Sequence, residues 1–369
     1  MQPGHQRCPA GRLLDTTIVI SRFFHSWEHR LASVSTNRTI RPFEWGTDWI
    51  GGGSAGDTRE DVERWVDEVM RDTDAFFACS PTHDYAFTPA PAELRANGEA
   101  GTLRFPSVLV TPHAVNNTVI GRWFPAADES PLGASGPRGR AVVVLPQWNS
   151  DAEGHIGLAK LLARFGVSAL RVSLPYHDVR KPPELARADY IVSSNVVRTL
   201  QVCRQAVVDA RRAVAWLQQQ GFDRIGILGT SLGSCLAMLT AAHEPRIKAQ
   251  ALNHVSPFFA DVVWRGLSTR HVREGLEGHV DLETLRHLWR PISPWTYLDR
   301  ARHTRTLLVY AKYDLTFPVD LSRKLVDEWA RRQLPHEVAV LPCGHYSTGA
   351  APFKFIDAYV LTTFLRRAL

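Results

Sequence analysis

The sequence predicts an α/β protein, in which helices accompany a mostly parallel β-sheet. Two observations support this class. From about residue 108 onward, short apolar runs alternate with amphipathic segments, which is the pattern of successive βαβ units. The chain of 369 residues is 44% hydrophobic and 22% charged, so it can bury a sizeable core and lacks the composition of a disordered protein.

Eight apolar runs are predicted to be strands. The first two are expected to form an antiparallel pair that opens the sheet. The third, Ala141 to Leu145, is apolar throughout, as a strand buried on both faces requires. The predicted strands cover residues 108–111, 118–124, 141–145, 167–174, 225–228, 247–252, 306–310 and 337–341.

Amphipathic segments between these runs are predicted to be helices. In the clearest one, apolar residues recur at steps of three and four and so share one face, and Gly221 ends the helix. We expect that face to pack against the sheet. Its apolar positions are Leu200, Cys203, Val207, Ala210, Val214 and Leu217. Further helices are predicted at 156–165, 234–242, 321–333 and 353–367.

The residues before the sheet form a distinct segment. Residues 1–95 contain an amphipathic helix near Arg59 to Asp72 and a glycine run, Gly51 to Gly53. We expect them to be an N-terminal extension that packs on a main domain of residues 96–369.

A second segment interrupts the alternation of strands and helices. Residues 256–299 carry large apolar residues in short helical pieces and are expected to be an insertion between two strands. These residues are Trp264, Leu282, Leu285, Leu288, Trp289 and Trp295. Their tryptophans suggest an apolar cover over a site, although such residues often serve packing alone.

Charge and cysteine content bear on the class of partner. The formal net charge is +6, yet the 43 basic residues are scattered among 37 acidic ones, so no nucleic-acid partner is expected. No stretch approaches the ~20 apolar residues of a membrane span. The apolar run Thr17 to Ile20 is shorter than a signal-peptide core, so a cytoplasmic location is expected. Five widely spaced cysteines without a CxxC pair indicate reduced thiols, namely Cys8, Cys79, Cys203, Cys235 and Cys343.

The main chemical motif is Gly229-Thr230-Ser231-Leu232-Gly233, a GxSxG sequence. It directly follows an apolar strand and opens a helix, which is the setting in which a tight turn exposes a nucleophilic serine. The flanking glycines are expected because such a turn leaves no room for side chains. Ser231 is therefore the predicted nucleophile.

A serine hydroxyl needs a base, and the base needs a carboxylate. His345 follows the last predicted strand and can take the proton from the serine. Asp314 follows the preceding strand and can orient the histidine and stabilise its charged form. Either residue alone has ordinary explanations, since Asp314 can cap a helix and His345 can be a polar loop residue. Together with Ser231 they lie at the carboxyl ends of three separate strands, where parallel sheets place their sites.

These residues and their order resemble the α/β-hydrolase superfamily, and within it the branch of dienelactone hydrolases and acetyl esterases. The resemblance covers about residues 100–369. It implies an eight-stranded sheet with helices on both faces, ester hydrolysis through an acyl-enzyme, no cofactor and no metal. It also implies a cap inserted after the sixth strand, which here is 256–299.

An oxyanion hole of two backbone N–H groups is expected beside the nucleophile. In the superfamily one comes from the residue after the serine, here Leu232. The other comes from the loop after the third strand, where Trp148 is the first candidate and Gln147 the next. This loop departs from the family's His-Gly or HGGG pattern, so the second donor stays open, and Trp148 can instead be a wall of the acyl pocket.

Several residues compete for roles in this site. His254 can in principle be the base but precedes the acid in the chain, so a pocket or core position is the alternative. Asp261 is a second candidate for the acid. Tyr176, with its neighbours His177 and Asp178, can line the substrate pocket or belong to a solvated loop. Cys343 is read as a buried structural thiol, because no elbow motif surrounds it. The candidate substrate-binding residues are thus Gln147, Tyr176 and His254.

The sequence therefore predicts hydrolysis of a small-molecule carboxylic ester. Acyl transfer or C–C cleavage can use the same triad, and a protein that keeps the fold but only binds is a further alternative. A dehalogenase is disfavoured because that chemistry needs an aspartate where Ser231 stands. Substrate identity and oligomeric state are not predicted.

Overall fold

The computed structural model describes residues 10–50, 56–127 and 139–369. Cys8 and the glycine run Gly51 to Gly53 lie outside the described residues. Among the described helices, none has both the length and the apolar character that a membrane span requires.

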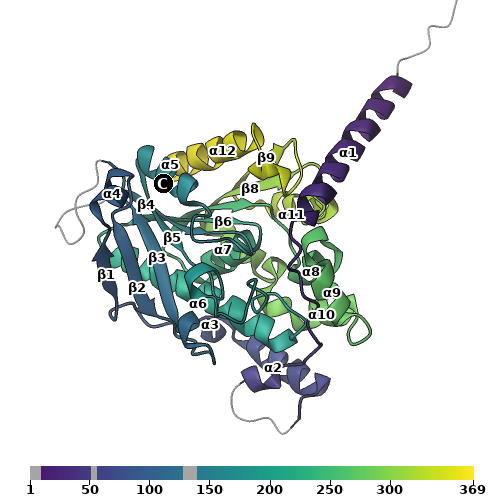
Figure 1. The fold of residues 1–369 in the computed structure, drawn as a ribbon, viewed down its shortest axis with the longest axis horizontal. Helices are drawn as coiled ribbons and strands as arrows, with labels where there is room; N and C mark the ends of the chain where they lie inside the picture. Colours follow the sequence, from purple (N-terminus) through teal and green to yellow (C-terminus); the bar gives the residue numbers. More distant parts are fainter. Residues whose placement is uncertain (1–9, 51–55, 128–138) are drawn as a thin grey trace, which may run out of the picture.

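The described chain folds around one nine-stranded sheet with strand order β1-β2-β3-β5-β4-β6-β7-β8-β9. The strands from β4 to β9 are parallel, while β1, β2 and β3 form an antiparallel edge (Figure 1). The strands are β1 (Ala86–Pro89), β2 (Gly101–Pro106), β3 (Thr118–Phe124), β4 (Arg140–Leu145), β5 (Val167–Val172), β6 (Arg224–Thr230), β7 (Ile247–Asn253), β8 (Arg305–Ala311) and β9 (His336–Leu341).

The predicted α/β class and mostly parallel sheet are confirmed, and one predicted strand is wrong. The partner of β3 is β2, and residues 108–111 form a loop. Burial explains the difference, because Leu103 and Phe105 of β2 point into the core whereas Val108 and Val110 are 46% and 84% exposed. Strand β1, which the sequence did not predict, adds a ninth strand at the edge beside β2.

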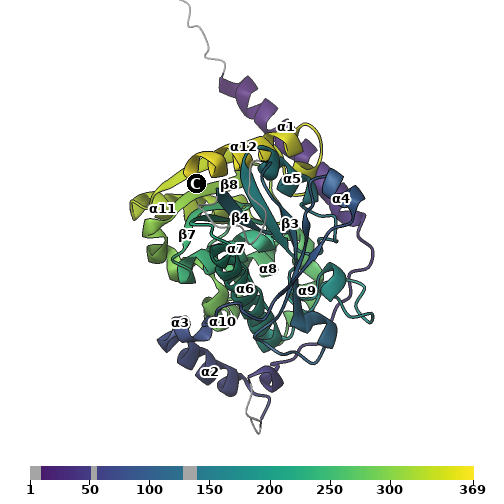
Figure 2. The same ribbon diagram turned by 90° about the vertical axis from the view of Figure 1, so that its left-hand side faces the viewer.

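Helices cover both faces of the sheet (Figure 2). On one face α5 and α12 pack on alternate side chains of the central strands, and on the other face α6 and α7 pack on the remaining ones. All six predicted apolar positions of α6 are buried, as the spacing requires. The helices of this layer arrangement are α5 (Ile156–Arg164), α6 (Val196–Gln219), α7 (Leu232–His243), α11 (Val319–Arg331) and α12 (Phe353–Ala368). A short helix, α4 (Ala92–Ala96), joins β1 to β2.

Short helices fill the connection between β7 and β8, where the sequence predicted an insertion. They are α8 (Phe259–Arg265), α9 (Arg270–Leu276) and α10 (Leu282–Leu288), followed by two 3-10 segments, Arg290–Ile292 and Pro294–His303. Figure 1 shows them together beside the carboxyl-end side of the parallel strands. The buried residues Leu285, Leu288 and Trp289 join this segment to the main core.

The N-terminal residues run along the same side of the molecule. Helix α1 (Ala10–Ser33) contacts the loops after β8 and β9, where Phe24 stacks on Tyr313 with ring centroids 4.5 Å apart. The chain then passes α9, where Phe43 stacks on His279 at 4.4 Å, and reaches α2 (Arg59–Arg71) and α3 (Thr73–Phe76) (Figure 1). Helix α2 matches its predicted bounds to within one residue.

Candidate active site

Ser231 lies at a sharp turn between β6 and α7. Its backbone has φ 57° and ψ −120°, a conformation that is strained for a residue other than glycine. A Cβ at Gly229 would lie 1.9 Å from the carbonyl oxygen of Gly233, and one at Gly233 would lie 2.3 Å from that of Leu145. The strand and the helix therefore approach so closely that both flanking positions need glycine.

The structure brings Ser231, His345 and Asp314 together. His345 Nε2 lies 3.1 Å from Ser231 Oγ, and His345 Nδ1 lies 3.0 Å from Asp314 Oδ2. The three residues follow β6, β9 and β8, so one edge of the parallel sheet supplies all of them. The ring of Phe317 stacks on the imidazole at 5.3 Å and helps to fix its plane.

Asp314 is held as a carboxylate although it is 4% exposed. Its Oδ1 accepts the backbone N–H groups of Thr316 at 2.8 Å and Phe317 at 2.7 Å. Burial opposes its charge, but the charge of His345 and hydrogen bonds from His254 and His345 hold the pKa of Asp314 well below its usual value. For His345, burial favours the neutral ring, yet the charge and hydrogen bond of Asp314 raise its pKa above the ordinary value.

His254 is the second histidine on this carboxylate. Its Nδ1 lies 2.9 Å from Asp314 Oδ2, and its ring centroid lies 4.3 Å from that of His345. It follows β7 and has φ 60°, so the backbone turns sharply to place the ring there. Since its hydrogen bond goes to the acid and none is formed with Ser231, the structure does not place His254 as the base.

The ligand atoms of His254, Asp314 and His345 lie within 4.8 Å of one another, as metal ligands also do. Both Nδ1 atoms are at hydrogen-bond distance from the same oxygen, 2.9 and 3.0 Å, so this oxygen can accept a hydrogen bond from each ring. This arrangement is that of a hydrogen-bonded network.

The loop after β4 is rigidly braced beside Ser231. Asn149 donates its backbone N–H to His177 Nε2 at 3.0 Å and accepts from the N–H of Ala188 at 2.8 Å, while the Trp148 indole donates to the Ala188 carbonyl at 2.9 Å. Within the described part of the chain, the backbone N–H groups of Trp148 and Leu232 have no acceptor at hydrogen-bond distance. Both predicted oxyanion donors are therefore free.

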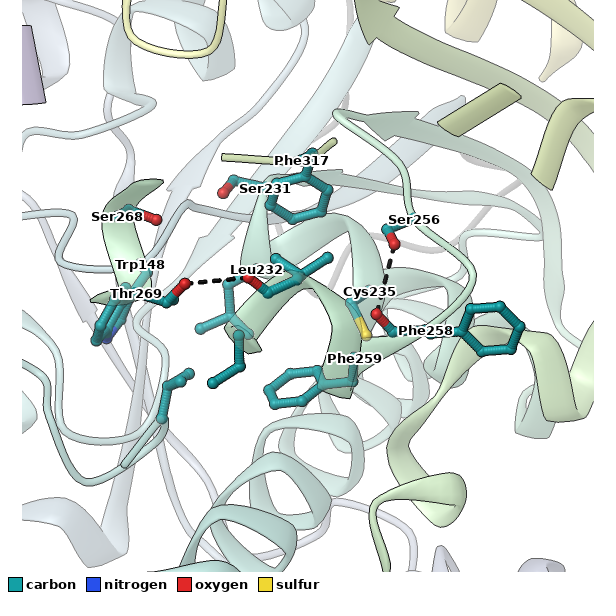
Figure 3. Close-up of a pocket in the computed structure, with 13 residues that line it drawn as sticks. Trp148, Ser231, Leu232, Cys235, Ser256, Phe258, Phe259, Ser268, Thr269 and Phe317 are labelled. Atoms are coloured by element: carbon teal, nitrogen blue, oxygen red, sulfur yellow. Dashed lines mark hydrogen bonds between the residues drawn. The ribbon is translucent and has the colours of Figure 1, made fainter. Parts of the chain in front are cut away.

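Two cavities meet at Ser231 and share its neighbours Trp148 and Ser268 as walls. The smaller, of about 40 Å³, is mostly apolar, and Figure 3 shows Trp148 and Thr269 on one side of it and Cys235 and Phe259 on the other. Its apolar walls are Trp148, Val192, Leu232, Phe258, Phe259, Val262, Val263 and Phe317. The larger, of about 800 Å³, is lined by the predicted residues Gln147 and His254.

Three of the competing residues lie elsewhere. Tyr176 was predicted to bind substrate, but its ring is buried in the core, bonded through its hydroxyl to His113 Nδ1 at 3.0 Å, and lines neither cavity. Asp261, the alternative acid, is buried in α8 and pairs with Arg286 at 2.6 and 2.8 Å. Cys343 is buried, and burial raises the pKa of its thiol to about 12.

The sequence did not reveal the role of Glu28. This carboxylate of α1 is 0% exposed and accepts two backbone N–H groups of the loop that carries His345, those of Tyr346 at 2.8 Å and Ser347 at 2.9 Å. Its side chain also packs on Gly344, where an added Cβ would lie 2.3 Å away. No motif links residues more than 300 positions apart, so only the fold shows the contact.

Comparison with known proteins agrees with this fold. Residues 155–268 match the family model described as alpha/beta hydrolase domain containing 18. A search of curated protein sequences finds no match. The chain has the α/β-hydrolase fold.

Several solved structures share the fold at low sequence identity. An acetyl xylan esterase from Paenibacillus sp. R4 is 16% identical with a TM-score of 0.61, covering 85% of this chain and 96% of that one. Acetyl xylan esterase 1 from Thermoanaerobacterium sp. JW/SL YS485 is 12% identical with a TM-score of 0.58, covering 84% and 98%. The acylaminoacyl peptidase of Pyrococcus horikoshii is 15% identical with a TM-score of 0.57, and the alignment covers 77% of this chain but only 42% of the peptidase.

Proposed function

We propose that this chain is a serine hydrolase that cleaves carboxylic esters through an acyl-enzyme. The observation that carries the proposal is the chain of hydrogen bonds from Ser231 through His345 to Asp314 at a strained turn. The fold alone does not establish activity, but this geometry is that of a nucleophile, a base and an orienting acid.

The reaction follows from these contacts. Ser231 Oγ attacks the ester carbonyl as His345 Nε2 accepts its proton, and Asp314 stabilises the resulting imidazolium. The N–H groups of Leu232 and Trp148 bind the developing oxyanion. His345 then protonates the departing alcohol oxygen, which leaves the acyl group on Ser231. A water molecule gives a proton to His345 Nε2 and attacks the acyl carbonyl. His345 then returns this proton to Ser231 Oγ as the bond between the acyl group and Ser231 breaks and the acid leaves.

The cavities suggest which part of the ester lies where. A cavity needs roughly 10–15 Å³ to hold one water molecule. The smaller cavity has a volume of about 40 Å³, so it has room for a group of roughly three heavy atoms. Its apolar walls suit a short acyl chain. Residues of α8 and of the turn before α9 form much of its wall, which supports a cap function for 256–299.

Hydrolysis of p-nitrophenyl esters from acetate to decanoate tests the proposal. We expect acetate to butyrate to be hydrolysed fastest, and Ser231→Ala to abolish turnover and labelling by a serine-reactive phosphonate. Ser33→Ala, at an exposed serine of α1, is the matched control and should behave as the wild type. Equal rates for wild type and Ser231→Ala would exclude the serine mechanism. Added alcohols that capture the acyl group in preference to water would indicate an acyltransferase.

A further inference from the structure

The larger cavity carries a buried cation, Arg187, whose charge is only partly matched. This residue is 9% exposed, and its Nε has no hydrogen-bond partner among the described residues. Its Nη1 lies 3.4 Å from the Asn37 amide oxygen, and its nearest carboxylate oxygen, Oδ1 of Asp189, is 3.6 Å from Nε. Both contacts are longer than a strong charge-assisted hydrogen bond.

Asp189 does not fully neutralise Arg187, because its carboxylate also pairs with a second arginine. Arg41 donates from Nε and Nη2 to Asp189 Oδ2 at 3.2 and 3.1 Å. Burial, the largest influence, lowers the pKa of Arg187, which shows that its charge is poorly solvated where it lies. One carboxylate is thus shared by two arginines.

A second arginine of the cavity, Arg38, comes from the N-terminal segment. Its Nη2 donates to the carbonyl of Ala32 at 3.0 Å and to the Tyr346 hydroxyl at 3.3 Å. In the described ranges no carboxylate lies within ion-pair distance of Arg38, and its Nε has no partner. The positive charges of Arg38 and Arg187 repel each other, and a bound anion would reduce this repulsion.

The guanidinium of Arg187 is held in place by an aromatic stack. It lies 5.2 Å from the ring centroid of Trp148, and the ring of His271 also stacks on this indole, with centroids 5.8 Å apart and ring planes 4° from parallel. Trp148 also borders Ser231 in both cavities. The arginine is therefore oriented relative to the nucleophile by the same residue that supplies an oxyanion donor.

The other charged residues of the cavity come from α12 and have opposite signs. They are Lys354 and Asp357. Burial raises the pKa of Asp357 to about 6, and its carboxylate accepts from Asn253 at 2.8 Å. At neutral pH these two charges nearly cancel, so Arg38 and Arg187 give the cavity its positive character.

We propose that the larger cavity binds an anionic group, a carboxylate or a phosphate, on the alcohol portion of the ester, with Arg187 and Arg38 as its ligands. The acyl portion occupies the small apolar cavity, whose described wall residues include no cation. Arginine suits this role because its planar fork matches both anions. This inference rests on the proposed ester hydrolysis and names the substrate class of the same site.

Two acetate esters that differ mainly in charge test the inference. The acetates of 4-hydroxybenzoate and of 4-hydroxybenzamide have similar shapes, and release of each phenol can be followed by absorbance. We expect kcat/KM to favour the benzoate, and Arg187→Gln to lower the benzoate-to-benzamide ratio by about tenfold to hundredfold, the effect of losing a hydrogen bond to a charged group. Arg38→Gln should lower the ratio in the same direction.

Two further variants separate charge from structure. Arg187→Lys keeps the charge and should retain more of the preference than Arg187→Gln. Arg64→Gln removes an exposed cation of α2 that pairs with Asp61 and lines neither cavity at Ser231, so both substrates should be hydrolysed at wild-type rates. A ratio that is the same in wild type and Arg187→Gln would overturn the inference, while Ser231-dependent hydrolysis of both esters would leave the proposed function intact.

Binding measurements decide the case even if no ester is hydrolysed. Calorimetry with 4-hydroxybenzoate and with inorganic phosphate should show binding to the full chain that Arg187→Gln weakens, and the tighter ligand identifies the type of anion. Absence of binding by either anion to a protein that hydrolyses acetates would refute the anion site. Binding without hydrolysis would support the anion site and refute the ester mechanism.

Discussion

Replacing Glu28 tests whether the N-terminal helix supports the active site. Each of its carboxylate oxygens accepts one backbone N–H of the loop that carries His345, at 2.8 and 2.9 Å. Glutamine keeps one oxygen but turns an amide N–H₂ toward the other donor, and alanine leaves both donors without an acceptor. One buried unsatisfied group costs about 1–3 kcal/mol, so the free energy of unfolding should fall by about 1–3 kcal/mol in Glu28→Gln and about 2–6 kcal/mol in Glu28→Ala.

The same substitution should change the pH dependence in a defined direction. Besides Asp314, the charge of Glu28 contributes to raising the pKa of His345. Without that charge the imidazolium is less stable, so the pKa of His345 falls in Glu28→Gln. Because the base must be neutral to accept a proton, the acidic limb of kcat/KM should move to lower pH.

Urea unfolding and a pH profile with p-nitrophenyl acetate measure both effects. Glu63→Gln is the control, because Glu63 forms an exposed ion pair with Arg59 in α2 and such pairs add little to stability. If Glu28→Ala unfolds like the wild type and keeps its pH profile, then α1 does not support the His345 loop in solution, and the reasoning from these contacts is refuted.

Three further substitutions probe the turn, the second histidine and the acyl pocket. Gly233→Ala should prevent cooperative folding in circular dichroism melts, because its Cβ would lie 2.3 Å from the Leu145 carbonyl oxygen; a normal melt would contradict the observed turn. His254→Gln removes a 2.9 Å hydrogen bond to Asp314, so kcat should fall about tenfold while KM changes little. If His254 had only a structural role, the melting temperature would fall without this selective loss of kcat. Val263→Ala enlarges the small cavity and should raise the butyrate-to-acetate ratio of kcat/KM; an unchanged ratio would place the acyl chain elsewhere.

The central strands and the long helices were predictable because their signals are local. Apolar runs gave seven of the nine strands, and periodic spacing located α6. The misplaced opening strand shows the limit of this reasoning. Residues 108–111 and β2 both contain apolar residues, and only packing against the core distinguishes them.

By itself, the sequence determined the α/β class, the turn that presents Ser231 and the residues that follow the parallel strands. These features depend on the succession of apolar runs and on glycine spacing, which involve residues close together in the chain. The tertiary structure decided which side chains meet. It joined His254 to Asp314, brought Glu28 to the His345 loop and placed Arg38 and Arg187 in one cavity. These contacts join segments far apart in the chain, and their partners are set by the packing of whole elements, which no local pattern encodes.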